Sequence, residues 1–306
     1  MRSVDLAIVG AGVAGLSAAA AAAPWGIDVL VIEHLAPGGQ VATVERIRNF
    51  PGFPDGIGGH ELGPLLLQQA EEAGAEFLFN SVERIARDGE DFLLGCAGED
   101  VRARVVILAV GSRRRALDVP GEQALKGRGV SHCASCDGPF FRGKTVIVAG
   151  GGDSAFDETE ILAQHAAAVV LVHNREKPAA QEAAIARVTA LPNVRILGRT
   201  EIVAVEGEGQ VERVALAGPG GRSGERADGL FVYVGLDPNN DLALDLAETD
   251  ARGAIIADAD FQTASPGLFV AGDVRSGATA LLASVAGDGA AAAHAAIRYL
   301  RTGAAA

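Results

Sequence analysis

Residues 4–23 read VDLAIVGAGVAGLSAAAAAA, and this stretch decides the fold of the first part of the chain. Its first six residues are apolar apart from one aspartate, and they have the length of a buried strand. Three glycines follow, and the alanine-rich run after them is a strong helix former. Residues 27–32 form a second apolar run, which predicts another strand. A strand, a glycine turn, a helix and a strand within about 30 residues predict a dinucleotide-binding unit.

The three glycines of this stretch, Gly10, Gly12 and Gly15, have the spacing GxGxxG. Glycines at these positions permit a tight turn, close approach of a pyrophosphate and tight packing of helix on strand. The helix that follows offers free N–H groups to the phosphates. Glu33 ends the second predicted strand, where a carboxylate can accept hydrogen bonds from ribose hydroxyls. We therefore predict dinucleotide binding here; the alternative is a glycine-rich turn with only a structural role.

The same pattern returns further along the chain as GGGDSA, in which Gly150, Gly152 and Ala155 take the three small positions. A strand is predicted before this motif and a helix after it, so the same physical argument predicts a second nucleotide site. The next predicted strand ends before Arg175 and Lys177, which can contact a phosphate on the adenosine ribose. The alternative for these two residues is an exposed charged loop.

The order of these elements predicts an α/β protein with two Rossmann-like, three-layer ββα dinucleotide-binding domains, the second inserted in the first. Residues 1–113 and 241–306 form the discontinuous first domain, because the C-terminal part contains no third nucleotide unit. Residues 114–240 form the inserted domain. Short β-prone runs separated by turn residues predict a small β-meander in each domain, at 75–107 and 201–234.

A Cys-x-x-Cys motif, CASCDG at 133–138, predicts redox chemistry. Cys133 and Cys136 can form a small reducible disulfide, and thiols in such motifs often have a depressed pKa. Asp137 can move protons as thiolates form and are quenched. The alternatives are half of a zinc site or two idle thiols. A zinc site needs more ligands, and Cys96 is the one remaining cysteine, so redox chemistry is favoured, Cys96 is predicted to be a small core residue, and no metal is expected.

The charge of the chain excludes some classes of partner. Its 26 basic and 39 acidic residues give a net charge of −13, and both nucleic acid and anionic membranes need a positive surface. The apolar start contains an aspartate and the glycine pattern, so we expect neither a targeting segment nor a membrane span. An odd number of cysteines with one Cys-x-x-Cys is typical of redox chemistry in the cytoplasm.

In combination, the motifs resemble the low-molecular-weight thioredoxin reductases along nearly the whole chain. The matching stretches are VGAGVAG (9–15), GGQ (38–40), RNFPGFP (48–54), CASCDG (133–138), GGGDSA (150–155) and AGDVR (271–275). The resemblance implies a homodimeric flavoprotein disulfide reductase. Electrons would pass from NADPH or NADH through FAD and the cysteine pair to thioredoxin or a similar dithiol/disulfide substrate.

The resemblance also implies roles for individual residues. FAD would bind at the first glycine motif with Glu33 on the ribose, and pyridine nucleotide at the second. Cys136 would be the thiol next to the flavin, Cys133 the interchange thiol and Asp137 the acid/base. The remaining residues implied to bind FAD are Gly39, Gln40, Asn49, Gly111, Asp273 and Val274.

Two stretches depart from the family pattern. The family reads the nucleotide phosphate with His-Arg-Arg-x-x-x-Arg, whereas this chain has Asn174, Arg175 and Ala179 at the three arginine positions. Arginine grips a phosphate with two hydrogen bonds and asparagine does not replace it, so the pyridine nucleotide stays open between NADPH and NADH. Ala280 and Leu281 replace a family Arg-Gln pair near the flavin. The alternatives are an FAD-dependent dithiol oxidase, a thioredoxin reductase-like enzyme with a different electron donor, and a flavin-binding structural or sensor protein.

Overall fold

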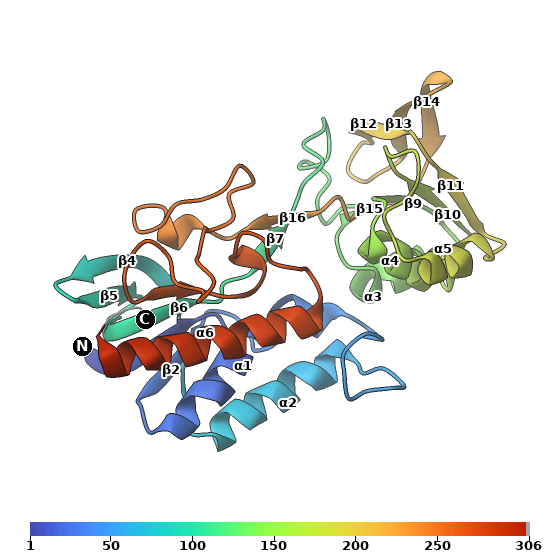
Figure 1. Ribbon diagram of the computed structural model, residues 1–306. Coiled ribbons are helices and arrows are strands. Elements are labelled where there is room, and N and C mark those ends of the chain that lie inside the picture. Colours follow the sequence, from blue (N-terminus) through green and yellow to red (C-terminus); the bar gives the residue numbers. More distant parts are fainter. Residues whose placement is uncertain (304–306) are drawn as a thin grey trace. The chain divides into compact units, whose positions relative to one another are not determined.

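The computed structural model describes residues 1–303, which fold into two compact units (Figure 1). The first unit consists of Met1–Arg113 and Asp237–Ala306, and the second is the segment between them, Arg114–Leu236. The second unit is therefore an insertion into the first.

The first unit is built on a seven-stranded sheet with the order β3-β2-β1-β6-β5-β4, in which β17 also pairs with β6. The four strands β3, β2, β1 and β6 run parallel, as does β17, while β4 and β5 are antiparallel. The strands are β1 (Arg2–Val9), β2 (Val29–Glu33), β3 (Glu76–Phe79), β4 (Val82–Asp88), β5 (Asp91–Cys96), β6 (Glu99–Leu108) and β17 (Leu268–Val270).

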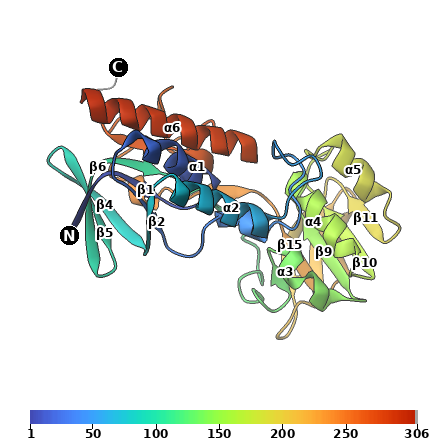
Figure 2. The same ribbon diagram turned by 90° about the horizontal axis from the view of Figure 1, so that it is seen from below.

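Three helices pack on one face of this sheet: α1 (Val13–Ala22), α2 (Gly59–Glu72) and α6 (Leu282–Thr302). Figures 1 and 2 both show α1 and α6 side by side. Small residues permit this contact, because a Cβ on Gly289 of α6 would lie only 2.0 Å from the carbonyl oxygen of Ala14. The alanine-rich composition of α1 and α6 thus serves close helix packing.

The second unit has three layers. Its central sheet has the order β11-β10-β9-β15-β8, and each neighbouring pair is parallel. Helices α3, α4 and α5 lie on one side of this sheet and the antiparallel sheet β12-β13-β14 on the other (Figure 1). The elements are β8 (Val130–Ser131), α3 (Ala134–Asp137), β9 (Thr145–Ala149), α4 (Asp153–Ala163), β10 (Ala168–Val172), α5 (Glu182–Thr189), β11 (Val194–Leu197), β12 (Glu201–Glu206), β13 (Arg213–Gly218), β14 (Gly221–Arg226) and β15 (Gly229–Val232).

The two passages of the chain from one unit to the other pair with each other. They are the short strands β7 (Ser112–Arg114) and β16 (Leu236–Pro238), which form a two-stranded sheet. Hydrogen bonds from Arg115 N to Gly235 O (3.0 Å) and from Asn239 N to Gly111 O (3.0 Å) flank the pair. Short 3-10 helices lie between these elements: η1 (Ala23–Trp25), η2 (Gly39–Thr43), η3 (Gly138–Phe141), η4 (Asp241–Ala243) and η5 (Gly272–Val274).

The predicted α/β fold with two Rossmann-like domains is confirmed, but neither predicted meander is one continuous antiparallel sheet. In the segment 75–107, β3 joins β2 in parallel and only β4, β5 and β6 are antiparallel neighbours. In the segment 201–234, β15 leaves the antiparallel hairpins and enters the central parallel sheet beside β9. A fully apolar run such as that of β15 fits a buried parallel strand as well as a meander strand.

Candidate functional site

The first glycine turn is shaped by contacts that a side chain would break. Gly10 has φ +101°, and its N–H donates to Ile32 O at 2.8 Å. A Cβ on Gly15 would lie 1.9 Å from Gly10 O, so only glycine lets α1 start this close to β1. Gly12 is the N-cap of α1, and a Cβ there would meet no atom within 4 Å. The turn is therefore tight behind Gly10 and Gly15 and open in front of Gly12.

Glu33, at the end of β2, is buried beside this turn. Its Oε2 accepts a hydrogen bond from Ala11 N at 2.7 Å, and its Oε1 accepts one from Leu35 N at 2.9 Å. The carboxylate thus fixes the backbone of the glycine turn, a role that sequence reasoning did not assign to it. Each carboxylate oxygen can accept more than one hydrogen bond, so capacity remains for ribose hydroxyls.

A polar chain connects three segments of the first unit. Gln40 Nε2 donates to Ser112 O at 2.8 Å and to Ser112 Oγ at 3.0 Å, and Ser112 Oγ donates to Asp273 Oδ2 at 3.3 Å. The other oxygen, Asp273 Oδ1, is buried and has no hydrogen-bond partner in the described part of the chain. Burial is the main cause that raises the pKa of Asp273. A buried acceptor without a partner costs free energy, so this carboxyl is suited to a ligand hydroxyl.

The remaining candidates of the first unit differ in their surroundings. Gly39 lies against the turn, since its Cβ would be 3.3 Å from Gly12 Cα. Gly111, with φ +63°, has open space where a Cβ would stand. Asn49 is exposed, and no hydrogen bond connects it to the other candidates. The side chain of Val274 is fully buried in the core, which leaves only its backbone available to a ligand.

The second glycine turn has the geometry of the first. Gly150 has φ +144°, and its Cβ would lie 2.3 Å from Tyr233 O. Gly152 is the N-cap of α4 with nothing within 4 Å of a Cβ, and the buried Ala155 takes the third small position. The free N–H groups at the start of α4 therefore face open space next to Gly152, as they do at the start of α1.

The loop after β10 contains few cations that are available to a phosphate. Arg175 and Lys177 are exposed, while Glu176 in the same loop forms an ion pair with Arg199. His173 is buried, burial lowers its pKa, and its Nδ1 has no partner among the described residues. The structure thus places Arg175 at the predicted strand end, with an acidic residue beside it.

Cys133 and Cys136 form a disulfide across the four-residue helix α3, here called the redox helix. Cys133 is the N-cap, and its Sγ accepts a hydrogen bond from Cys136 N at 3.2 Å. Cys136 is exposed and Cys133 is half-buried. A sulfur that accepts a backbone N–H at a helix start is a stabilised thiolate when the bond is reduced.

Asp137 lies directly behind the disulfide. Its Oδ2 accepts a hydrogen bond from Ser131 Oγ at 2.5 Å, and the same hydroxyl accepts one from Cys133 N at 3.1 Å. The carboxyl is therefore connected to the backbone of the first cysteine through one hydroxyl.

Glu158 and Tyr233 form hydrogen bonds at the start of the redox helix, and the sequence analysis identified neither residue. Glu158 Oε2, on α4, accepts hydrogen bonds from Ala134 N and from Tyr233 OH, each at 2.9 Å. Burial raises the pKa of Glu158, and it also raises the pKa of Tyr233, whose ring lies 6.0 Å from the guanidinium carbon of Arg114. The sequence signal for Glu158 was its place one turn into the helix of the second glycine motif.

The third cysteine, Cys96, is buried at the end of β5, as predicted, and burial is the main cause that raises its pKa. Within residues 1–303, no three His, Cys, Asp or Glu side chains are grouped so that they could hold a metal ion. Among the described helices, none is long and apolar enough to cross a membrane.

Comparisons with known proteins agree along nearly the whole chain. Residues 4–298 match the family described as pyridine nucleotide-disulphide oxidoreductases. The thioredoxin reductase of Treponema pallidum is 39% identical over 300 residues, which cover 97% of each chain. That of Bacillus subtilis is 37% identical, over 97% of this chain and 94% of the relative. The crystal structure of Lactococcus lactis thioredoxin reductase has a TM-score of 0.94 and 33% identity over 97% of this chain and 99% of that one.

Proposed function

The chain belongs to the pyridine nucleotide-disulphide oxidoreductases and, within them, to the thioredoxin reductases, and from this premise we propose that it reduces thioredoxin or a similar disulfide. The electrons come from NADPH or NADH and pass through FAD and the Cys133–Cys136 pair. The observation that supports this most directly is the disulfide itself, which lies at an accessible helix start with Asp137 behind it.

The cysteine pair performs the exchange with the partner. In the reduced pair, the Cys133 thiolate attacks one sulfur of the partner disulfide, forms a mixed disulfide and releases the other partner sulfur as a thiolate. Cys136 then attacks Cys133 Sγ, which closes the internal disulfide and releases the second partner thiolate. The Cys136 N–H bond to Cys133 Sγ supports Cys133 as the attacking thiolate.

Asp137 holds the proton in this exchange. The hydrogen bonds from Ser131 Oγ to Asp137 and from Cys133 N to Ser131 Oγ hold this carboxyl near the first cysteine, where we propose that it gives a proton to the departing partner thiolate. General acid/base catalysis by a positioned carboxyl typically contributes about 100-fold or more.

The first unit fits FAD. Two features are suited to it: the open space in front of Gly12, where a pyrophosphate can approach the start of α1, and the unpartnered Asp273 Oδ1, which can accept a ribitol hydroxyl. Gly10, Gly15 and Glu33 shape this cradle, and Gly39, Gln40, Asn49, Gly111 and Val274 are proposed to line it. When bound, FAD supplies the two-electron chemistry between a nicotinamide and a disulfide.

The second unit fits a pyridine nucleotide at the turn formed by Gly150, Gly152 and Ala155. Arg175 is exposed, so it can contact a 2′-phosphate, but a single arginine gives a weak preference. We therefore propose that the enzyme accepts both NADPH and NADH.

The remaining assignments rest on the resemblance. We assign residues 1–113 and 241–306 to FAD binding and residues 114–240 to pyridine-nucleotide binding. We further propose that the enzyme is a homodimer located in the cytoplasm.

One experiment tests the direction of electron flow. The purified enzyme with bound FAD is titrated without oxygen with NADPH, NADH and dithiothreitol while the flavin absorbance is recorded. Bleaching by a pyridine nucleotide, followed by thioredoxin reduction that a Cys133→Ser variant cannot perform, is expected. Bleaching by dithiothreitol alone would instead identify a dithiol oxidase or a reductase with another electron donor, an alternative supported by the single exposed Arg175.

A further inference from the structure

Three groups meet beneath the first peptide of the redox helix. Glu158 Oε2 lies 2.9 Å from both Ala134 N and Tyr233 OH, and Ala134 N lies 3.1 Å from Tyr233 OH. The amide nitrogen of Ala134 belongs to the peptide bond that follows Cys133. A carboxylate is therefore fixed one peptide away from the sulfur-bearing residue that we propose attacks the partner.

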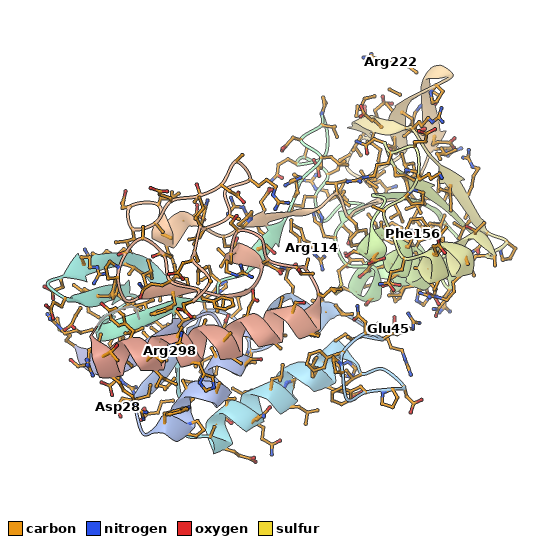
Figure 3. All side chains as sticks on the ribbon, viewed as in Figure 1. Asp28, Glu45, Arg114, Phe156, Arg222 and Arg298 are labelled. Atoms are coloured by element: carbon orange, nitrogen blue, oxygen red, sulfur yellow. A yellow bond between two sulfur atoms is a disulfide. The ribbon has the colours of Figure 1, made fainter. Side chains whose placement is uncertain are left out.

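Two charged side chains act on Glu158: Asp157 on the same helix raises its pKa and Arg114 lowers it. On α4, Asp157 is adjacent and accepts a hydrogen bond from Arg187 of α5. Arg114, which belongs to β7 and is labelled in Figure 3, is the cation that favours the charged form of Glu158. On the redox helix, Asp137 faces Ser131.

Tyr233, at the end of β15, is the direct partner of the carboxylate. Burial raises the pKa of its phenol, so the phenol stays protonated and its O–H donates a hydrogen bond to Glu158 Oε2. Burial is also the main cause that raises the pKa of Glu158, so this carboxyl gains a proton more readily than an exposed one.

We propose that Glu158 is a positioning residue that holds the start of the redox helix through Ala134 N and whose negative charge sets the reduction potential of the Cys133–Cys136 disulfide. This inference rests on the proposed disulfide reductase function. Reduction breaks the S–S bond, adds two electrons and takes up one proton when Cys136 ends as a thiol and Cys133 as the thiolate that attacks the partner. A fixed carboxylate disfavours the negative charge on Cys133 Sγ in the reduced pair, and it therefore favours the oxidised pair.

The test is an equilibrium measurement on the enzyme with bound FAD. Wild type and Glu158→Gln are each equilibrated with mixtures of reduced and oxidised dithiothreitol, whose two thiols supply the electrons and protons and become its internal disulfide. The reduced fraction is read from the mass added by alkylation of the free thiols. The glutamine carbonyl oxygen can accept the same two hydrogen bonds, so the fold is retained.

At pH 8, the substitution should shift the equilibrium constant about tenfold toward the reduced pair, or about 30 mV for a two-electron couple. Toward low pH the two proteins should converge, because protonation makes the wild-type Glu158 neutral as well. In a Tyr233→Phe background the convergence should occur at higher pH, because the hydrogen bond that favours the charged form is gone. Glu160→Gln, which affects a residue of the same helix that pairs with Arg187, should leave the constant unchanged.

Two results would overturn the inference and leave the reductase function intact. One is a Glu158→Gln constant equal to that of wild type at pH 8. The other is a shift of the same size at every pH, since a purely structural role has no reason to vanish when the carboxyl is protonated. A wild-type pair that never exchanges with dithiothreitol would remove the proposed function, and this inference with it.

Discussion

Alanine substitutions at two glycines of the first turn should separate folding from cofactor binding. In Gly15→Ala, the new Cβ would lie 1.9 Å from Gly10 O, although real Cβ atoms essentially never approach a neighbour within 3.0 Å. The obstacle is backbone and cannot rotate away, so α1 must move about 1 Å from β1, at an overpacking cost of about 3 kcal/mol. For a unit of this size, each kcal/mol lowers Tm by about 2–4 °C, which gives a loss of about 6–12 °C.

Gly12→Ala is the matched variant. Gly12 has φ −71°, and its Cβ would meet no atom within 4 Å, so the apoprotein should lose no more than about 1 kcal/mol. The added methyl group would stand where the pyrophosphate is proposed to approach α1. We expect FAD affinity to fall about 100-fold, which corresponds to about 2.7 kcal/mol.

Both quantities are measured on apoprotein. Thermal unfolding followed by circular dichroism gives Tm, and titration with FAD followed by flavin fluorescence gives Kd. Gly15→Ala should lower Tm, whereas Gly12→Ala should keep Tm and lose affinity. Wild-type Tm in Gly15→Ala, or wild-type Kd in Gly12→Ala, would refute the assignment of these glycines.

Three further substitutions address the site and its support. Asp137→Asn should slow thioredoxin reduction about 100-fold at unchanged flavin content, and an unchanged steady-state rate would exclude the proton-holding role. Arg275→Leu removes the ion-pair partner of Asp288, a carboxylate whose side chain is only 15% exposed, and should cost about 2 kcal/mol in urea unfolding. Asp288→Leu in the same chain should partly recover this loss. The raised pKa of Asp273 means that the fold prefers the protonated carboxyl, so the apoprotein loses stability as pH rises from the ordinary pKa of 3.8 up to the raised one. Asp273→Asn should therefore raise Tm at pH 8 and raise it much less at about pH 3.5, while equal gains at both pH values would contradict the burial argument.

The sequence predicted local geometry best within one short stretch. The tight turns at both glycine motifs, the acid at the end of β2 and the disulfide of the Cys-x-x-Cys run each involve groups within a few residues, so spacing alone predicts their geometry, while their roles stay proposals. The strands and helices around the turns followed from apolar runs and alanine content for the same reason.

The contacts that join distant segments had no such signal. Ser112 donates to Asp273 across 161 positions, and Tyr233 reaches Glu158 across 75. A single sequence shows the residue types at these positions but not which of them meet after folding. Glu33 shows a milder form of this limit, because its position was predicted while its bonds to the backbone of the turn were not.

The pairing of β7 with β16 has a consequence for how such a protein can be assembled from parts. The second unit begins and ends at these two paired strands. For the first unit, the insertion is therefore equivalent to one long surface loop. Loop length adds only slowly to the entropy cost of closure, and domain insertions are tolerated best where the two ends lie close together. We therefore expect that the second unit can be replaced by another domain with adjacent termini while the first unit keeps the strand register of its own sheet.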